Sequence, residues 1–511
     1  MPTFTNPVLP GFYPDPSCIR VGDTFYMANS SFQFFPGIPI HKSKDLINWE
    51  IIGNAINRPS QLDLTPATTK VNNASRGETF TGGVYAPTLR HHNGVFYIVC
   101  TMLTGTTDMQ PSEDFQPSNF IVTATNLEDP SSYSNLIYFD FYGIDPSLFF
   151  EDDGRVYVQG SWIHGYRKTP ATVIRQAEID LVTGKLFPEP VDIWGGYTGK
   201  VPEGPHIYKK DGWYYLLIAE WGTHGRHKIT IARAKDIWGP YETYENNPVL
   251  TAEGSSGLVQ CVGHGDLFQD AGGHWWCVML ARREYGGNFP LGRETYLTSV
   301  EWPENEFPSF EPVEIEQRVG GFGVELASLL TLYLRTPGLG NYRQDGNVVS
   351  LTSTGPDLGV LAGTATFVGQ RQTNLDSVAR TTLLVNYSKA TNISFGLTVY
   401  KDPFRYVTIE YNFLDSALTL KHQEAGKPLV TVSSATVQKR DVTSLELCIT
   451  SSTEKYVFEA IKIPGSGERE HIALGEVPCS ALSGDDFTGT VYAIYASGEE
   501  TAVFRDFEIR N

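Results

Sequence analysis

Basic residues are scarce in this chain of 511 residues. The 39 lysines and arginines are outnumbered by 58 aspartates and glutamates, which leaves a formal net charge of −19. Nucleic acids and anionic membrane surfaces bind proteins through clusters of positive charge, so neither is expected as a partner. A neutral ligand such as a carbohydrate is compatible with this composition.

Cysteines and long apolar runs are also scarce. The six cysteines show no CxxC or other metal-binding spacing, so neither a zinc site nor a disulfide framework is expected. Three of them lie in apolar, strand-like runs and are predicted to be buried thiols: Cys18, Cys100 and Cys277. No apolar run reaches 18 residues, so no membrane-spanning helix is expected. The start, MPTFTNPVLP, lacks the charged and apolar regions of a signal peptide, which leaves a secreted and a cytoplasmic location both open.

Helical periodicity is scarce, whereas aromatic and β-branched residues are plentiful. The chain has nine Trp, 26 Tyr and 28 Phe, and segments rich in them alternate with turns rich in Gly, Pro, Asn and Asp. This alternation predicts an all-β protein. Aromatic faces can stack on sugars, but most of these side chains are expected simply to fill the core.

A short strand-like run that ends at a glycine followed by aromatic residues recurs five times. The glycines stand at positions 22, 94, 154, 212 and 273, at intervals of 72, 60, 58 and 61 residues. A repeat of this length is typical of radial architectures in which each repeat forms one small sheet. A hairpin and further strands in each repeat make a four-stranded blade, so we predict a five-bladed β-propeller over residues 1–315.

The pattern changes between Glu304 and Gly323, where Pro, Glu and Gly predominate. Beyond this linker, about ten short runs of alternating hydrophobic residues are separated by turns, which predicts a β-sandwich. We expect a concanavalin-like β-sandwich over residues 316–511, with the domain boundary within 304–330. It carries no cluster of carboxylates, so its expected role is structural, or to wall one side of a pocket in the propeller.

Each of the five repeats begins with a residue that can take part in chemistry. These residues are Asp15, Tyr85, Asp145, Glu203 and His264. If the repeats are equivalent blades, the five side chains project from one structural position toward a common axis. Three carboxyl groups in one pocket suit glycoside hydrolysis, which needs a general acid and a base or nucleophile. A third charge is useful because it raises the pKa of the acid.

These residues also have plainer interpretations. Asp15 and Asp145 precede prolines and Glu203 lies in a Pro-Glu-Gly-Pro turn, where acids are usually turn formers. Three acids at one repeat position favour a functional site instead, because an inward-facing acid is costly unless it is paired or used. His264 is a core histidine, a substrate contact or a cation ligand. Arg293 is either a surface residue or a group that contacts sugar hydroxyls and holds a carboxylate ionised.

Phe32, in the aromatic cluster SSFQFFPG, either floors a sugar subsite or fills the core. At these residues, and over almost its whole length, the chain resembles glycoside hydrolase family 43, in particular the β-xylosidases and α-L-arabinofuranosidases with a C-terminal β-sandwich. The motifs that carry the resemblance are GFYPDPS, GIPIHKSKDLINW, GIDPSLFFEDDG, PEGPHIYKKDGWYYLL and LGRET. The resemblance implies a five-bladed, inverting and exo-acting enzyme.

The resemblance also implies a role for each candidate residue. Asp15 matches the general base, Glu203 the general acid, and Asp145 the group that raises the pKa of the acid and orients it. The remaining matches are Phe32 in the −1 subsite, Arg293 on substrate hydroxyls, His264 on the axis, where some members bind calcium or water, and Phe487 reaching from the sandwich into the pocket. No cofactor is required, and a structural calcium at the axis is the one metal that the resemblance suggests.

Two positions depart from the family pattern. Tyr85 stands where the β-xylosidases usually have Trp, and Ile144 stands where they usually have Phe. Both changes alter the apolar wall around the terminal sugar. We therefore expect a hydrolase that releases terminal β-D-xylosyl residues, α-L-arabinofuranosyl residues or both from xylo-oligosaccharides or arabinoxylan. An endo-acting arabinanase and a carbohydrate-binding propeller without catalysis are the alternatives.

Overall fold

The computed structural model describes residues 5–72, 78–105, 116–164, 170–315, 331–385, 394–484 and 486–510. The chain divides into two compact units. The first comprises Met1–Leu62, Gly82–Glu284 and Arg293–Arg318, and the second comprises Asp63–Thr81, Tyr285–Gly292 and Val319–Asn511. Within the described ranges, no helix is long and apolar enough to cross a membrane.

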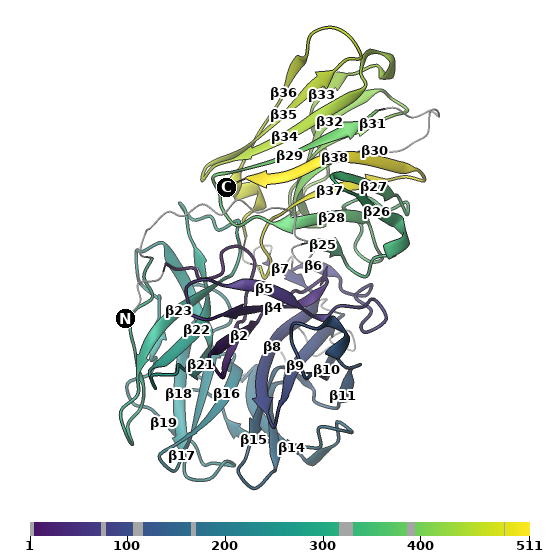
Figure 1. Ribbon diagram of the computed structural model, residues 1–511. Helices are drawn as coiled ribbons and strands as arrows, with labels where there is room; N and C mark the ends of the chain where they lie inside the picture. The colour runs from purple at the N-terminus through teal and green to yellow at the C-terminus, as the bar shows by residue number, and fades with distance from the viewer. Residues whose placement is uncertain are drawn as a thin grey trace. The chain divides into compact units, whose positions relative to one another are not determined.

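Five antiparallel sheets make up the first unit, and in each of them four strands follow one another in chain order (Figure 1). The strands are β1 (Ser17–Val21), β2 (Thr24–Ala28), β4 (Gly37–Ser43) and β5 (Glu50–Ile56); β8 (Gly83–His92), β9 (Val95–Thr104), β10 (Gln116–Ala124) and β11 (Ile137–Phe139); β12 (Gly143–Phe150), β13 (Val156–Ile163), β14 (Thr172–Ile179) and β15 (Leu186–Trp194); β16 (Glu203–Lys210), β17 (Trp213–Glu220), β18 (Lys228–Ala234) and β19 (Glu242–Thr243); and β21 (Val259–Gln269), β22 (Trp275–Arg283), β23 (Glu294–Glu301) and β24 (Ser309–Phe310). The short strand β20 (Leu250–Thr251) also pairs with β18, and β3 (Phe34–Phe35) lies between β2 and β4 in the chain.

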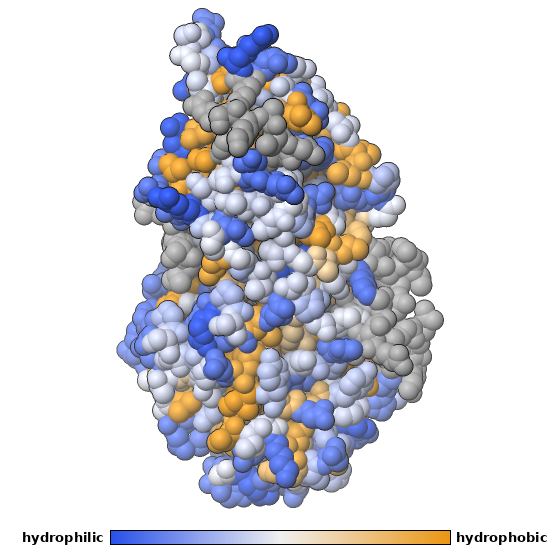
Figure 2. Space-filling view, turned by 90° about the vertical axis from the view of Figure 1, so that its right-hand side faces the viewer, coloured by the Kyte–Doolittle hydropathy of each residue, from blue (hydrophilic) through white to orange (hydrophobic). Residues whose placement is uncertain are grey.

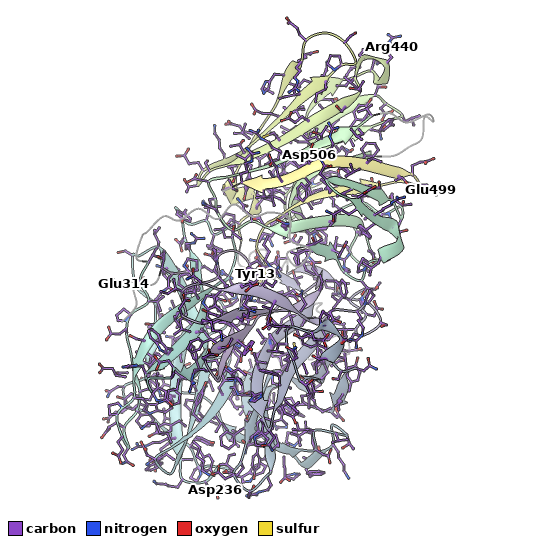
Figure 3. All side chains as sticks on the ribbon, viewed as in Figure 1. Tyr13, Asp236, Glu314, Arg440, Glu499 and Asp506 are labelled. Carbon is purple, nitrogen blue, oxygen red and sulfur yellow. The ribbon has the colours of Figure 1, made fainter. Side chains whose placement is uncertain are left out.

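The first strands of the five sheets form a closed ring. β1 contacts β8, β8 contacts β12, β12 contacts β16, β16 contacts β21, and β21 contacts β1. The start of the chain secures the closure, because the backbones of Leu9 and Thr295, in β23, exchange hydrogen bonds of 3.3 and 3.2 Å. Side chains fill the space between the sheets (Figure 3). The five-bladed propeller predicted from the repeat is therefore confirmed.

One detail of the repeat prediction is wrong, because the five leading residues do not share one structural position. The strands β8, β12, β16 and β21 each carry an irregularity in their pairing beside the leading residue. The equivalent point of each blade is a residue with positive φ, and these residues are Asp15 (52°), Ala86 (37°), Asp145 (55°), Gly204 (57°) and His264 (50°). Tyr85 and Glu203 precede this point by one residue. Spacing alone cannot show the offset, since a bulge changes the count of residues between two equivalent points.

The second unit is a β-sandwich, as predicted. The strands of one sheet run in the order β25-β28-β37-β30-β31-β32-β33, and those of the other in the order β26-β27-β38-β29-β34-β35-β36. Their bounds are β25 (Leu332–Leu334), β26 (Tyr342–Asp345), β27 (Val348–Thr352), β28 (Thr366–Arg371), β29 (Ser377–Leu384), β30 (Ser394–Asp402), β31 (Arg405–Asn412), β32 (Ala417–Gln423), β33 (Val430–Thr436), β34 (Ser444–Ser451), β35 (Lys455–Ile463), β36 (Glu470–Pro478), β37 (Val491–Ser497) and β38 (Thr501–Arg510). Alternate side chains of both sheets form one apolar core, in which Leu397 and Ile409 meet Leu447 and Phe458.

Two segments that the sequence assigns to the propeller belong to the second unit, namely residues 63–81 and 285–292. The first contains the hairpin of β6 (Thr69–Asn72) and β7 (Glu78–Thr81). Its carbonyl at Ala67 accepts a 2.8 Å hydrogen bond from the buried Arg335. In the second segment the Pro290 carbonyl accepts one of 3.1 Å from the Thr490 amide. The expected boundary within 304–330 stays a prediction, since residues 316–330 lie outside the described ranges.

The distribution of polar residues and of cysteines agrees with what the composition predicts. In the view of Figure 2, hydrophilic residues predominate and the apolar ones lie in separate small patches. The three cysteines predicted to be buried thiols, Cys18, Cys100 and Cys277, are buried and free, which confirms that prediction.

Candidate active site

Asp15 lies two residues before the start of β1, and two side chains donate hydrogen bonds to its buried carboxylate. Oδ2 accepts a 2.6 Å hydrogen bond from Ser30 Oγ, and Oδ1 accepts one of 2.8 Å from Arg293 Nη1. The chain just before it is anchored by Tyr13, labelled in Figure 3, whose carbonyl accepts a 2.6 Å hydrogen bond from Thr295 Oγ1. A cation and a hydroxyl thus fix the direction of the carboxylate, as a general base requires.

Asp145 is buried in β12 and is joined to the backbone of the next blade. Its Oδ2 accepts a 3.1 Å hydrogen bond from the amide of Gly204, the residue after Glu203. Burial raises the pKa of Asp145 to about 6, an increase that His264 opposes and the charge of Asp15 reinforces. The bond to Gly204 lets Asp145 orient the strand that carries Glu203.

Glu203 begins β16, and its side chain is 15% exposed. The carbonyl of the preceding Pro202 is held by two hydroxyls, Ser161 Oγ at 2.8 Å and Thr172 Oγ1 at 2.9 Å. Burial raises the pKa of Glu203 well above its ordinary value, and the charges of Asp145 and Asp15 raise it further. Glu203 is therefore suited to remain protonated at a pH where an ordinary glutamate is ionised, which is the state a general acid needs.

His264 and Arg293 complete the polar part of this group. His264 Nδ1 lies 3.9 Å from Asp15 Oδ1, so the imidazole borders the acids. The interpretation of Arg293 as a surface residue is wrong, because it is only 4% exposed and pairs with Asp15.

The predicted aromatic and apolar residues gather beside Arg293. Its guanidinium carbon lies 5.2 Å from the centre of the Phe32 ring, which lies 4.5 Å from that of Tyr85. Phe32 is completely buried, so it supports Tyr85 and Arg293 from behind, and its place in a sugar subsite stays a prediction. Ile144, next to Asp145 in β12, is partly exposed.

Phe487 belongs to the second unit, where its ring lies 5.5 Å from that of Phe80. That Phe487 reaches into the pocket, and that the sandwich forms one wall of it, both stay predictions.

Two residues near the acids were not predicted from the sequence. Ser30 binds Asp15 and also accepts a 2.7 Å hydrogen bond from the Ala86 amide, so it links two blades. His227 precedes β18, and its Nε2 lies 3.7 Å from Glu203 Oε1. Neither residue belongs to the first strand of a blade, so the repeat gives no signal for them. The two serines that open the Phe32 motif SSFQFFPG are the one hint at Ser30.

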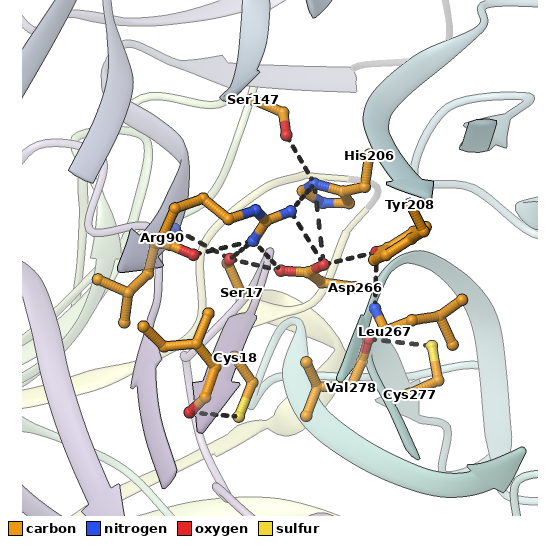
Figure 4. Close-up of polar contacts among 12 residues, drawn as sticks. Ser17, Cys18, Arg90, Ser147, His206, Tyr208, Asp266, Leu267, Cys277 and Val278 are labelled. Atoms are coloured by element: carbon orange, nitrogen blue, oxygen red, sulfur yellow. Dashed lines mark hydrogen bonds and ion pairs between the residues drawn. The ribbon is translucent and has the colours of Figure 1, made fainter. Parts of the chain in front are cut away.

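A second polar cluster lies further along the first strands. On four of the five strands it includes the residue two positions beyond the equivalent point, about 7 Å along the strand, and these residues are Ser17, Ser147, His206 and Asp266. On β8 it includes Arg90, four positions beyond Ala86. It is centred on the buried ion pair of Arg90 and Asp266, whose Nη1 and Oδ2 are 2.8 Å apart (Figure 4). Asp266 also accepts 2.6 Å hydrogen bonds from Ser17 Oγ and Tyr208 OH, and Arg90 Nη2 donates one of 2.9 Å to His206 Nδ1. Burial alone would raise the pKa of Asp266, but Arg90, His206 and the Ser17 hydroxyl lower it to about 2.

The described side chains around the axis do not provide a set of ligands for a calcium ion. Calcium takes about six to eight oxygen ligands. Among the described residues, no three His, Cys, Asp or Glu side chains are grouped so that they could hold a metal ion. The carboxylate nearest His264, that of Asp15, already binds Arg293, and Asp266 binds Arg90. Arg90 therefore supplies a fixed positive charge at the axis from the protein itself.

Comparisons with known proteins agree with both the fold and the group of acids. The glycosyl hydrolases family 43 matches residues 4–308, and the beta xylosidase C-terminal concanavalin A-like domain matches residues 333–510. A xylosidase/arabinosidase from Butyrivibrio fibrisolvens is 43% identical over 314 residues, which are 60% of this chain, and the match spans only 56% of the relative's length. A non-reducing end α-L-arabinofuranosidase from Bacteroides ovatus is 32% identical over 544 residues, or 98% of this chain and 92% of the relative. This protein is also similar to the crystal structure of a xylan β-1,4-xylosidase from Bacillus halodurans. The two structures align over 100% of each chain, with a TM-score of 0.85 and 28% sequence identity.

Proposed function

Because the chain belongs to glycosyl hydrolase family 43, we propose that it is an exo-acting, inverting glycoside hydrolase. Its proposed substrates are xylo-oligosaccharides or arabinoxylan, from which it releases terminal β-D-xylosyl residues, α-L-arabinofuranosyl residues or both. The observation that carries the proposal is the state of Glu203, whose pKa is raised by burial and by the charges of Asp145 and Asp15. A carbohydrate-binding propeller would gain nothing from three buried acids of this kind.

In the proposed mechanism the reaction is a single displacement. Asp15 takes a proton from a water molecule, and the water oxygen attacks the anomeric carbon. Glu203 gives its proton to the oxygen of the leaving group, so the glycosidic bond breaks as the new bond forms. Asp145 keeps Glu203 protonated before the reaction and orients its strand through the Gly204 amide. Inversion requires about 6.5–9.5 Å between the carboxyl groups of Asp15 and Glu203, to leave room for the water.

The choice between the two sugars depends on the wall beside the acids. Tyr85 is 8% exposed and packs on Phe32, and Ile144 is partly exposed next to Asp145. The relatives carry both names, xylosidase/arabinosidase and α-L-arabinofuranosidase. Since xylopyranose and arabinofuranose present similar hydroxyls, one pocket with this wall is proposed to accept either of them.

Kinetics with p-nitrophenyl β-xyloside, p-nitrophenyl α-L-arabinofuranoside and doubly substituted arabinoxylan oligosaccharides test the proposal. We expect turnover of at least one of the p-nitrophenyl glycosides and release of single sugars from an oligosaccharide. Mixed oligomeric products would contradict exo action and favour the endo-acting arabinanase. Glu203→Ala should abolish turnover of the oligosaccharides, whose leaving groups need a proton, and leave sugar binding intact. A wild-type protein that binds these sugars and hydrolyses none of them would favour the binding propeller.

A further inference from the structure

His227 is a buried imidazole in which one nitrogen forms a hydrogen bond and the other finds no partner within the described ranges. Its Nδ1 lies 3.1 Å from the carbonyl oxygen of Cys261, which can only accept a hydrogen bond. Nδ1 therefore carries the proton, and in a neutral ring the other nitrogen, Nε2, presents a lone pair. Nε2 is buried, has no hydrogen-bond partner among the residues that the structure describes, and faces Glu203 Oε1 at 3.7 Å.

The backbone of β21 is shaped around this ring. Gly263 lies in the irregular part of the pairing between β21 and β22, and a Cβ there would lie 2.3 Å from the His227 Nδ1 and Cε1 atoms. A side chain at this position would displace the ring, so glycine makes the seat for His227. Burial also lowers the pKa of His227 well below its ordinary value, so the ring stays neutral.

The other charged and titratable groups near the pair lie on several blades. Asp145, Asp15 and Arg293 act on Glu203, and His264, Arg293 and His224 act on His227. Of these, the two aspartates favour a protonated Glu203 and Arg293 opposes it. No described residue donates a hydrogen bond to the Glu203 side chain. The protonation of Glu203 therefore depends on whether a neighbouring side chain presents a hydrogen-bond donor or a lone pair to it.

We propose that His227 is a positioning residue for the general acid, and that it acts by withholding a hydrogen-bond donor from Glu203. At 3.7 Å the contact is longer than a hydrogen bond, so it does not engage the acidic proton. A lone pair facing Oε1 disfavours the ionised carboxylate and leaves the proton free for the glycosidic oxygen. An N–H at the same place would stabilise the carboxylate and lower the pKa of the acid. The Cys261 carbonyl holds the ring in the useful tautomer.

The test compares two substitutions, His227→Gln and His227→Phe. Both remove the bond to the Cys261 carbonyl, so its structural effect is common to them, whereas only glutamine can present an N–H to Glu203. Because the general acid sets the basic limb of the kcat/KM profile, this limb should move to lower pH by about one unit in the glutamine variant and by less in the phenylalanine variant. The acid limb should stay where it is. His274→Gln, at an exposed histidine, is the matched control.

The leaving group separates this role from a structural one. With xylobiose at neutral pH, His227→Gln should lose about tenfold in kcat/KM, whereas with a dinitrophenyl glycoside, which leaves without a proton, it should lose less than about twofold. Equal losses on both substrates, or a basic limb that does not move in an active variant, would overturn the role. In the wild-type protein, ¹⁵N NMR should show His227 neutral and protonated at Nδ1, and a proton at Nε2 would overturn it as well.

The role of His227 rests on the proposed function, but different results would overturn the role and the function. A wild-type protein that cleaves no glycoside would overturn both. A wild-type protein with a bell-shaped profile whose basic limb is unchanged in His227→Gln would overturn the role of His227 alone.

Discussion

The propeller axis holds two neighbouring polar clusters in which buried carboxyl groups have opposite protonation states. In the acid cluster, formed by Asp15, Asp145 and Glu203, burial raises the pKa of Asp145 to about 6 and that of Glu203 well above its usual range. In the arginine cluster, centred on Arg90 and Asp266, the carboxyl of Asp266 is just as buried and its pKa is lowered to about 2. The same ring of strands positions both.

The difference lies in the number of donors and cations for each carboxyl group. Asp266 has an arginine and two hydroxyl donors for itself, so its charge is stabilised. In the acid cluster, Arg293 pairs with Asp15. Among the described residues, Asp145 accepts a hydrogen bond from one backbone amide, and Glu203 faces a histidine lone pair. Burial therefore does not decide whether a carboxyl group is ionised. The supply of donors does, and the acid cluster is short of them where a proton has to be kept.

Glu203→Gln is expected to have the largest effect, because it removes the transferable proton and keeps the shape of the side chain. Turnover of xylobiose should fall by about a thousandfold, within the range typical for a lost general acid. The kcat for a dinitrophenyl glycoside should fall much less, and this substrate serves as the control for folding and binding. An equal fall for both substrates would remove Glu203 from the acid's role.

Asp266→Asn breaks the arginine cluster and should mainly affect stability. Removing one partner of a buried ion pair costs about 3–5 kcal/mol, since the charge of Arg90 is left without a counter-ion. Urea unfolding at neutral pH measures this loss. Because the folded-state pKa of Asp266 is depressed to about 2, its contribution is complete above about pH 4 and is lost as the pH falls from 4 to 2.

The deficit of Asp266→Asn should therefore shrink over that acidic window. Ser17→Ala, which removes a hydroxyl donor to Asp266 and the acceptor of the Leu89 amide, is the matched control and should cost about 1–2 kcal/mol. An Asp266→Asn variant as stable as the wild type would show that the two clusters do not differ in the way described.

Asp145→Asn should change the free energy of unfolding in the opposite direction to Asp266→Asn. It should stabilise the protein, although it impairs catalysis. A folded-state pKa raised from 3.8 to about 6 means that the folded state binds a proton more tightly than the unfolded chain. Stability from this group therefore falls as the pH rises from about 4 to 6, by up to about 3 kcal/mol. The variant should gain most at pH 8 and little at pH 4, as measured by urea unfolding at both. A gain that does not depend on pH would contradict the raised pKa.

Ser30→Ala tests the donors on the base. The substitution removes a 2.6 Å hydrogen bond to Asp15 Oδ2 and leaves the Ala86 amide without its acceptor. Each lost bond is worth about 1 kcal/mol, so kcat/KM should fall about tenfold and the unfolding free energy by about 1–2 kcal/mol. Ser31→Ala, at the next hydroxyl, is the matched control for activity. A loss of the same size at Ser31 would mean that packing, not the bond to Asp15, is responsible.

Removal of metal ions should have the smallest effect. Since Arg90 provides the positive charge at the axis and the described side chains there do not provide a set of ligands for calcium, we propose that neither activity nor melting temperature depends on calcium. Dialysis against a chelator, followed by addition of calcium, measures both quantities. Loss on chelation that only calcium restores would contradict this expectation and return His264 to consideration as a ligand.

The sequence predicts the fold well because the fold is repetitive. The five glycines with their aromatic residues and the alternation beyond Gly323 are local signals, and the ring and the sandwich follow from them. The one-residue offset at Tyr85 and Glu203 does not follow, because residue types do not mark a bulge and the spacing does not show where the extra residue lies. The transfer of residues 63–81 and 285–292 to the second unit also depends on long-range contacts, such as that of Arg335 with Ala67.

The candidate site also contains residues that the sequence predicts and residues that it does not. Asp15, Asp145 and Glu203 stand at the start of first strands, so the repeat alone predicts that they lie close together. Ser30 and His227 lie outside these strands and reach the acids only through the path of the chain in three dimensions. The arginine cluster is missed for another reason: Arg90 resembles an outward-facing strand residue, and its partner Asp266 lies 176 residues away.

The stereochemistry of the first product tests the mechanism most directly. Hydrolysis of whichever p-nitrophenyl glycoside is cleaved faster can be followed by proton NMR from the first minutes, before the free sugar mutarotates. Single displacement by water, with Asp15 as base and Glu203 as acid, predicts that the first sugar has the opposite anomeric configuration to the substrate. A first product with the configuration of the substrate would show a covalent intermediate and would contradict the proposed roles of both residues.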